Sequence, residues 1–297
     1  DDFRDTLATG ASLFARGDWK FVAGDAAVET LWLLGPAGIA VYDRVEAEPP
    51  RTLSRGFKES GYYVMRDGWS YNSSYVIVSC GASGCGHAHA DALSFELASE
   101  GNTWVVDSGT FTYTSDERSR DEFRLSHAHN TVTIDDQSQS VPAGPFSWGH
   151  VAEARAIEFV TRDGFDYFAG SHDGYERFAD PVTHTREIIL FKSEPRLIVR
   201  DTFKARGRHS YSISYHLSPG CSAVADGPQV QATAEDGSQL LIMVWGRNQP
   251  RAHVTRGWVS RCYGRREIAP VARFEAEGAG PQEFITVIIP SAKKVIE

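Results

Sequence analysis

Four of the ten histidines stand in two His-Ala-His triplets, at residues 87–89 and 127–129. Asp107 lies between the triplets, at the end of the apolar run TWVV. In an extended strand, residues two apart point to the same face, so each triplet would present both imidazoles to one side. Imidazoles and a carboxylate brought together by neighbouring strands are ligands for a borderline metal such as zinc. One such triplet is more often a pair of hydrogen-bonded histidines, but two of them flanking an aspartate predict a metal site.

The bulk composition restricts the partners. The chain has 297 residues, enough for one large β-domain or two smaller domains. Its formal net charge is −9 and it has no basic block, which argues against nucleic acid or an anionic membrane as the main partner. No apolar run approaches the length of a membrane span, so we expect no membrane insertion. An acidic polysaccharide stays compatible, because a local cleft of Arg and His can lie in an acidic surface.

Neither the N-terminus nor the cysteines identify the cellular compartment of the protein. The first ten residues, DDFRDTLATG, are acidic and lack the apolar core of a signal peptide. We therefore expect either a cytoplasmic protein or a processed or truncated piece of a longer one. Cys80 and Cys85 are close enough in sequence for a local disulfide, but free buried thiols are an equal alternative. Neither Cys221 nor Cys262 completes a zinc-ribbon spacing.

Two patterns of hydrophobic residues divide the chain. Residues 1–48 are rich in Ala and Leu at three- and four-residue spacing, which predicts two short helices broken at Gly35 and Pro36. Residues 49–297 alternate in short segments separated by turn residues, which predicts a mainly β fold, a large antiparallel β-sandwich. The expected elements near the triplets are strands at 60–67, 74–81 and 130–136, a hairpin at 92–109 and a loop at 141–150.

Three blocks in order carry a resemblance to a known family. GHAHADALSFEL, WVVDSGTFTY and HNTVTIDDQSQS resemble the C-terminal β-sandwich domain of the heparinase II/III-like polysaccharide lyases. Later segments, HTREIILFK, RLIVRDTF and RGWVSRCYG, are similar as well. The resemblance covers roughly residues 50–295, and the first 45 residues resemble the end of the family's helical domain.

The resemblance implies an activity and a site. The family joins an N-terminal α/α toroid to this sandwich and cleaves uronic-acid polysaccharides by β-elimination. Most of the toroid is absent here, and in the family it supplies a tyrosine and an asparagine or histidine that act on the uronate, so a helical domain or partner would complete the site. The resemblance implies one zinc ion per chain, held by His89, Asp107 and His129, that fixes the cleft wall, with direct Lewis-acid chemistry as the second choice. It places His87 and Tyr113 in the catalytic cleft and favours a periplasmic or secreted location.

β-Elimination needs a neutralised carboxylate, a base and a proton donor for the leaving oxygen. His87 suits the first two tasks because imidazole titrates near neutral pH. Tyr113 would donate a proton or stack on a sugar. Three arginines are candidates for bidentate binding of carboxylate or sulfate, although a solvated loop is the simpler reading of each: Arg118, Arg120 and Arg124.

His127 has three open roles. It is a candidate for substrate binding in the cleft, for a fourth metal ligand, or for a residue that hydrogen-bonds a ligand.

Three other functions compete with the lyase. A cupin-type oxygenase would need a glutamate earlier than Glu96. A non-haem iron oxygenase would use His89, Asp91 and a distal histidine, and it leaves the Asp107 block unexplained. A catalytically incomplete, zinc-stabilised sandwich that binds carbohydrate or serves structure is the strongest rival. The substrate also stays open, because heparan sulfate, alginate and other glycuronans all fit the resemblance.

Overall fold

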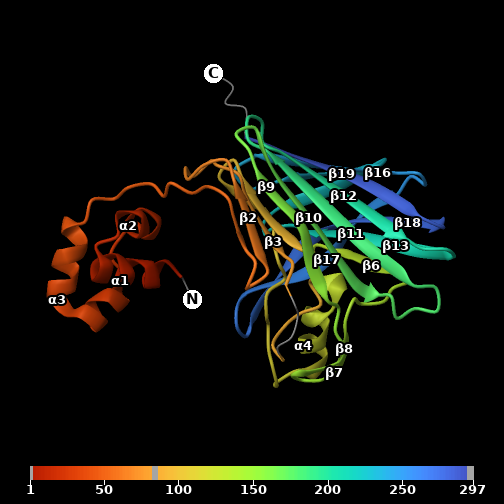
Figure 1. Ribbon diagram of the computed structural model, residues 1–297, viewed down its shortest axis with the longest axis horizontal. Helices are drawn as coiled ribbons and strands as arrows, with labels where there is room; N and C mark the ends of the chain where they lie inside the picture. Colours follow the sequence, from red (N-terminus) through yellow and green to blue (C-terminus); the bar gives the residue numbers. More distant parts are fainter. Residues whose placement is uncertain (1–2, 82–85, 293–297) are drawn as a thin grey trace. The chain divides into compact units, whose positions relative to one another are not determined.

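The computed structural model describes residues 3–81 and 86–292 (Figure 1). The chain divides into two compact units, Asp1–Leu53 and Ser54–Glu297. The boundary that the composition predicts, between residues 48 and 49, lies a few residues before this division. No helix in the described ranges is long and apolar enough to cross a bilayer.

The first unit contains three helices, α1 (Arg4–Phe14), α2 (Gly17–Ala23) and α3 (Val28–Arg44). The prediction of two helices was therefore one short. The segment of α2 is too brief to show a period, and the ring of its Trp19 packs directly on Gly10 of α1. The predicted break is confirmed inside α3, where Gly35 has a φ of 65° before Pro36. A small core of Ala8, Ala11 and Tyr42 holds the helices together.

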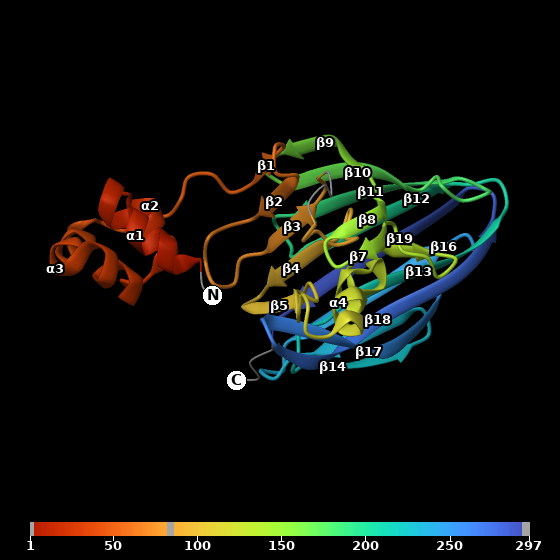
Figure 2. The ribbon, with the colours of Figure 1, turned by 90° about the horizontal axis from the view of Figure 1, so that it is seen from below.

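The second unit is a sandwich of antiparallel sheets, which confirms the predicted mainly β fold (Figure 2). The five-stranded sheet has the order β1 (Arg55–Phe57), β2 (Tyr62–Arg66), β3 (Tyr75–Ser79), β4 (Phe95–Ser99) and β5 (Asn102–Val105). The eight-stranded sheet has the order β14 (Ser222–Asp226), β15 (Gln229–Thr233), β16 (Gln239–Gly246), β19 (Gln282–Ser291), β12 (Arg196–Lys204), β11 (Val182–Phe191), β10 (Phe165–Tyr175) and β9 (Ala154–Thr161). The four-stranded sheet has the order β17 (Arg251–Cys262), β18 (Arg265–Ala279), β13 (Arg208–His216) and β6 (Val132–Ile134).

One hydrophobic core joins these three sheets. Buried side chains from all three belong to a single cluster. Several strands alternate buried and partly exposed residues, as β11 does along its whole length, and turn one face to this core. The largest buried side chain is Trp104 of β5, whose Nε1 donates to the carbonyl of Ser99. A bridge between Val105 and Leu217 links the five-stranded sheet to the end of β13. The ends of β5 and β13 are thereby held together beside Asp107.

The predicted hairpin at 92–109 is confirmed as β4 and β5, with the register Ser99 opposite Asn102. Its two turn residues, Glu100 and Gly101, both have positive φ, at 54° and 75°, as a type I′ turn requires. The predicted strands at 60–67, 74–81 and 130–136 correspond to β2, β3 and β6.

The prediction of a loop at 141–150 was wrong. These residues form a two-stranded ribbon, β7 (Val141–Gly144) and β8 (Ser147–His150). Pro142 is tolerated because both strands of such a ribbon are edge strands. Proline and glycine in this segment had masked the strand pattern.

Cys80 is a buried free thiol, and burial raises its pKa to about 12. Cys221 and Cys262 are also free. The alternative prediction, a disulfide between Cys80 and Cys85, involves Cys85, which lies outside the described residues.

Candidate functional site

The two His-Ala-His triplets are not on strands, so the premise of an extended backbone was wrong. His87 and His89 lie in the connection between β3 and β4, and His127 lies in a 3-10 helix, η1 (Ser126–Ala128). His129 follows η1 directly, before β6. The tight turn of η1 separates the second pair: His129 is fully buried, whereas His127 is exposed.

His89, Asp107 and His129 nevertheless converge from three separate segments. Each offers a nitrogen or oxygen ligand atom, and the three atoms lie within 4.8 Å of one another. His129 Nδ1 donates to Asp107 Oδ2 over 2.6 Å, and Asp107 Oδ1 accepts from the backbone N–H of Gly109 over 2.8 Å. The rings of His89 and His129 lie 5.1 Å apart.

The charges in this cluster are tightly coupled. Burial opposes ionisation of both Asp107 and His129, but their mutual attraction outweighs it: the pKa of Asp107 lies below its usual value and that of His129 above. Burial, together with the neighbouring His129, lowers the pKa of His89 to about 4. A zinc ligand set requires neutral imidazoles and an ionised carboxylate. His89 and Asp107 are already in these states, whereas His129 would have to release a proton when zinc binds.

A metal ion also fits the donor set. His129 Nδ1 is the nitrogen that faces Asp107, so a metal ion shared by the two residues would take the place of the proton between them. Two imidazoles and a carboxylate form a donor set typical of zinc with one position left open.

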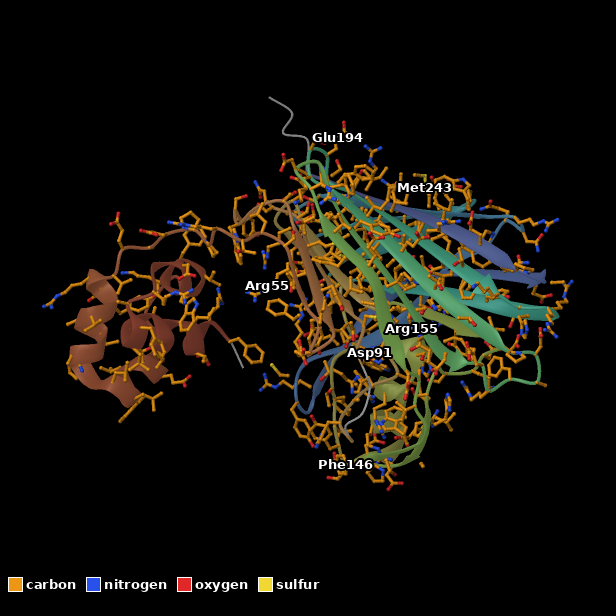
Figure 3. All side chains as sticks on the ribbon, in the orientation of Figure 1. Arg55, Asp91, Phe146, Arg155, Glu194 and Met243 are labelled. Carbon is orange, nitrogen blue, oxygen red and sulfur yellow. The ribbon has the colours of Figure 1, made fainter. Side chains whose placement is uncertain are left out.

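His87 lies apart from the cluster, in a group of aromatic rings. Its imidazole is exposed, stands 4.9 Å from the ring of Tyr113 at 90°, and lies 4.9 Å from the ring of Phe146. Tyr113 also faces Tyr263, with 5.5 Å between ring centroids. Figure 3 places Phe146 at the turn of the β7–β8 hairpin.

A cavity of about 740 Å³ adjoins both groups and is lined by His87, His89 and Asp107. It is also lined by two acids, Asp91 and Glu96. Burial, together with Asp107, raises the pKa of Glu96 to about 7, and burial also raises the pKa of Asp91. The cavity thus brings a free imidazole, a candidate metal centre and two carboxyl groups of weakened acidity together.

The three arginines belong to α4 (Glu117–Arg124) and differ in their surroundings. Arg120 and Arg124 share the buried face, one helical turn apart, and both line a small recess with His87, His89 and Tyr113. Arg118 is exposed.

The partners of the two buried arginines also differ. Arg120 makes a bidentate ion pair with Asp121. Arg124 Nη1 donates to the carbonyl of Gly144 over 3.0 Å and to the same Asp121 over 3.4 Å, and the guanidinium stacks on Trp148. Its Nε and Nη2 are buried without a partner in the described part of the chain.

His127 lines a different, smaller cavity of about 70 Å³, together with Glu122, Arg256 and Arg273. It is therefore not part of the ligand cluster, and the role of fourth metal ligand has no support in its position.

Several residues of the site were not predicted. Tyr263 lies 150 residues after Tyr113, at the tip of the β17–β18 hairpin, and no local pattern marks it. Phe146 was assigned to a loop, and Glu96 was considered only as a misplaced cupin ligand. The family block RGWVSRCYG, which contains Tyr263, was the one available sign.

Known proteins resemble this chain over most of its length. The family model described as "Heparinase II/III-like, C-terminal" matches residues 49–295, most of the chain. The chain belongs to this family. The heparin-sulfate lyase of Pedobacter heparinus is 25% identical over 255 residues, which are 84% of this chain and 36% of that protein. The heparin-sulfate lyase of Bacteroides thetaiotaomicron is 32% identical over 189 residues, 60% of this chain and 25% of that protein.

The heparinase II/III-like fold is also found among solved structures. The crystal structure of the heparan sulfate lyase HepC from Pedobacter heparinus matches with a TM-score of 0.79 at 23% identity, over 98% of this chain and 42% of that one. At this identity the match establishes the fold alone. The heparinase II/III-like chain spans about a third of the length of the first curated relatives.

Proposed function

We propose that this heparinase II/III-like chain is the C-terminal part of a lyase that cleaves uronic-acid-containing polysaccharide by β-elimination. One observation carries the proposal: His87 lines the same large cavity as His89 and Asp107, two members of the three-residue cluster. The relatives named heparin-sulfate lyase support the reaction class. Because the chain spans about a third of these relatives, the activity is proposed for the whole protein that carries it.

His89, Asp107 and His129 would hold one zinc ion. When bound there, zinc supplies a positive charge that fixes the three segments and polarises oxygen atoms near them. His89 is two residues from His87, so a ligand role for His89 would immobilise the segment that presents His87 to the cavity. We therefore assign the site a positioning role before a direct catalytic one.

His87 and Tyr113 are the proposed catalytic pair. The exposed imidazole of His87 is in T-shaped contact with the Tyr113 ring, so one sugar ring lying against this pair would meet both residues. His87 would take the proton next to the uronate carboxylate or neutralise that carboxylate. Tyr113 would protonate the leaving oxygen, with Tyr263 packed behind it.

Arg124 is the arginine best placed to bind an acidic substituent. Its Nε and Nη2, buried and without a partner among the described residues, form the fork that would bind carboxylate or sulfate in bidentate fashion, and its side chain lines the recess beside His87. Arg120 donates to both oxygens of Asp121, whereas Arg124 makes one longer contact with that carboxylate, so the role of Arg120 in binding would be weaker. Substrate binding by Arg118 and His127 stays a prediction, since neither lies beside His87.

We also propose that residues 1–48 are the end of a larger helical domain. Their helices leave large apolar side chains in contact with solvent, among them Phe3 (86% exposed), Trp32 (83%) and Val28 (71%). So much exposed apolar surface on three short helices indicates a missing helical partner. The family resemblance supports an α/α toroid in this role, and a periplasmic or secreted location.

The test is a product assay on the whole protein. Heparan sulfate, alginate and other glycuronans are incubated with wild type, with His87→Ala and with His253→Ala. His253 is a half-buried histidine of β17 that serves as the matched control. We expect an ultraviolet-absorbing unsaturated uronate with wild type and the control, and its loss with His87→Ala. Polysaccharide binding without any unsaturated product would favour the rival function, a carbohydrate-binding sandwich.

A further inference from the structure

Asn130, the residue after His129, is a buried junction between the segments that carry the metal ligands. Its Nδ2 donates to two carbonyls, that of Phe95 over 2.9 Å and that of Val106 over 2.8 Å. Its Oδ1 accepts from the backbone N–H of His216 over 2.7 Å. These partners define the orientation of the amide, because the nitrogen faces only carbonyls and the oxygen faces an N–H.

Most of these hydrogen bonds join backbone groups that lie close in sequence to a metal-ligand residue. Val106 precedes Asp107, and its own N–H donates to the carbonyl of His216 over 2.9 Å. Asn130, Val106 and His216 therefore form a closed triangle that sets the distance between the Asp107 and His129 segments. The backbone N–H of Asn130 donates to Ser94 Oγ over 3.0 Å, which adds the segment that follows His89.

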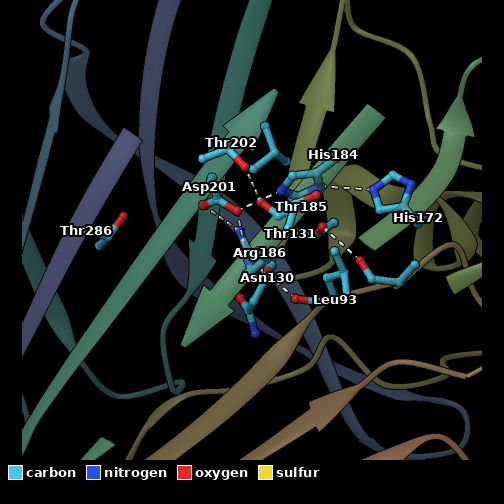
Figure 4. Close-up of polar contacts among 12 residues, drawn as sticks. Leu93, Asn130, Thr131, His172, His184, Thr185, Arg186, Asp201, Thr202 and Thr286 are labelled. Atoms are coloured by element: carbon cyan, nitrogen blue, oxygen red, sulfur yellow. Dashed lines mark hydrogen bonds and ion pairs between the residues drawn. The ribbon is translucent and has the colours of Figure 1, made fainter. Parts of the chain in front are cut away.

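Arg186 of β11 holds the same junction from the opposite sheet (Figure 4). Its Nη1 donates to the carbonyl of Asn130 over 2.6 Å and to the carbonyl of Leu93 over 2.8 Å. Its Nε and Nη2 form a bidentate ion pair with Asp201, at 2.7 and 3.1 Å. Arg186 and Asp201 are both fully buried.

Two histidines complete the buried network. His184 Nε2 donates to Asp201 Oδ1 over 2.7 Å, and His172 Nε2 lies 3.0 Å from His184 Nδ1. Asp201 thus accepts from three nitrogens and holds the Arg186 guanidinium in one orientation, with its free edge toward the two carbonyls.

The backbone conformation of Leu93 explains why its carbonyl needs the hydrogen bond from Arg186. Leu93 is fully buried and has a φ of 61°, a left-handed conformation that costs free energy for a side chain with a Cβ. Such a residue persists only when its surroundings define the backbone completely, and Arg186 is bonded to its carbonyl. A buried ion pair by itself adds little net stability. The role of Arg186 is therefore better indicated by its hydrogen bonds to the carbonyls of Asn130 and Leu93.

We propose that Asn130 and Arg186 are positioning residues, which hold the His89, Asp107 and His129 segments at the spacing that binds metal. This inference rests on the proposed metal centre. Neither residue offers a ligand atom to the cluster. Their side chains act on the ligands only through backbone groups, those of residues 93, 95, 106, 130 and 216.

The test compares Asn130→Asp and Arg186→Lys with a control, Asp166→Asn, in the chain of 297 residues. Asn130→Asp keeps the shape but turns a donor into an acceptor facing two carbonyls. Arg186→Lys keeps the charge but loses the fork. Asp166 is a fully buried acid whose partners are Ser54 and Lys192. Zinc affinity is measured by titration at a temperature where every variant is folded, and amide hydrogen exchange is followed without metal.

We expect zinc affinity to fall at least about tenfold in both variants and to be kept in the control. Exchange should quicken at residues 86–94 and 126–131 in the two variants and not in Asp166→Asn. Wild-type zinc affinity and unchanged exchange in folded variants would overturn the inference. Absence of zinc binding by wild type would instead overturn the proposed metal centre, and the exchange pattern would still decide whether the two residues position these segments.

Discussion

His209 of β13 is held between two carboxylates, and we predict that it makes stability depend on pH. Its Nδ1 lies 2.6 Å from Asp135 Oδ2 and its Nε2 lies 2.9 Å from Asp180 Oδ2. A neutral imidazole has one N–H and cannot donate at both nitrogens, so this arrangement requires the imidazolium. Burial opposes the charge, but the hydrogen bonds to both carboxylates raise the pKa of His209 above its usual value.

The sign and size of the effect on stability follow from the two hydrogen bonds of His209 to the carboxylates. Because the folded pKa is raised, the stabilisation is complete below the unfolded value of about 6.5 and is lost as pH rises through the folded pKa. Deprotonation removes one charge-assisted hydrogen bond. The imidazole is only 6% exposed but the carboxylates are partly exposed, so we expect a loss of about 1–2 kcal/mol. For a unit of this size, that corresponds to a fall in Tm of about 2–8 °C.

The assay is thermal unfolding of wild type and His209→Gln across neutral and mildly alkaline pH, in one buffer series at constant ionic strength. The quantity of interest is the difference in Tm between the two proteins, since the other titrating groups are common to both. We predict that wild type is the more stable at low pH and that the difference shrinks as pH rises. A difference that stays constant with pH would refute the reasoning about the clamped imidazolium.

Three further outcomes are expected. Zinc at 100 times its Kd should stabilise wild type by about 2.7 kcal/mol and raise Tm by about 5–11 °C, reversed by a chelator, whereas Asp107→Asn should show no shift. Trp104→Ala should cost about 3–5 kcal/mol in a denaturant titration, because its ring is fully buried between the sheets; a change under about 1 kcal/mol would contradict that packing. If the whole protein has the proposed lyase activity, Arg124→Ala should raise its KM roughly 10-fold or more, with Arg155→Ala of β9 as the control, and an unchanged KM would exclude a carboxylate or sulfate on Arg124.

Much of the fold follows from local patterns in the sequence. Alternation of apolar and polar residues predicted β2, β3 and the β4–β5 hairpin, and Gly35 with Pro36 predicted the break in α3. The ribbon at 141–150 was missed because its glycines and prolines obey turn statistics while its pairing is a tertiary effect. Helix α2 was missed for a similar reason, since packing on α1 compensates for its short length.

The candidate site was predicted in part. Residue type and spacing pointed to the two His-Ala-His triplets and Asp107, and the family resemblance selected His89, Asp107 and His129 among them. The backbone that delivers these residues is a loop and a 3-10 helix rather than two strands. The residues that position these ligands could not be predicted from the sequence. Arg186 lies 56 residues from Asn130, and their hydrogen bond arises from the way one sheet packs on another. Such contacts leave no periodic trace in a single sequence.

The central claim is that His89, Asp107 and His129 together hold one zinc ion beside His87. Elemental analysis of the purified chain tests this most directly, with wild type beside His89→Ala and His129→Ala. The account predicts one zinc per chain in wild type and its loss in both variants. No metal in wild type, or metal retained after His129→Ala, would contradict the assignment of these three residues as its ligands.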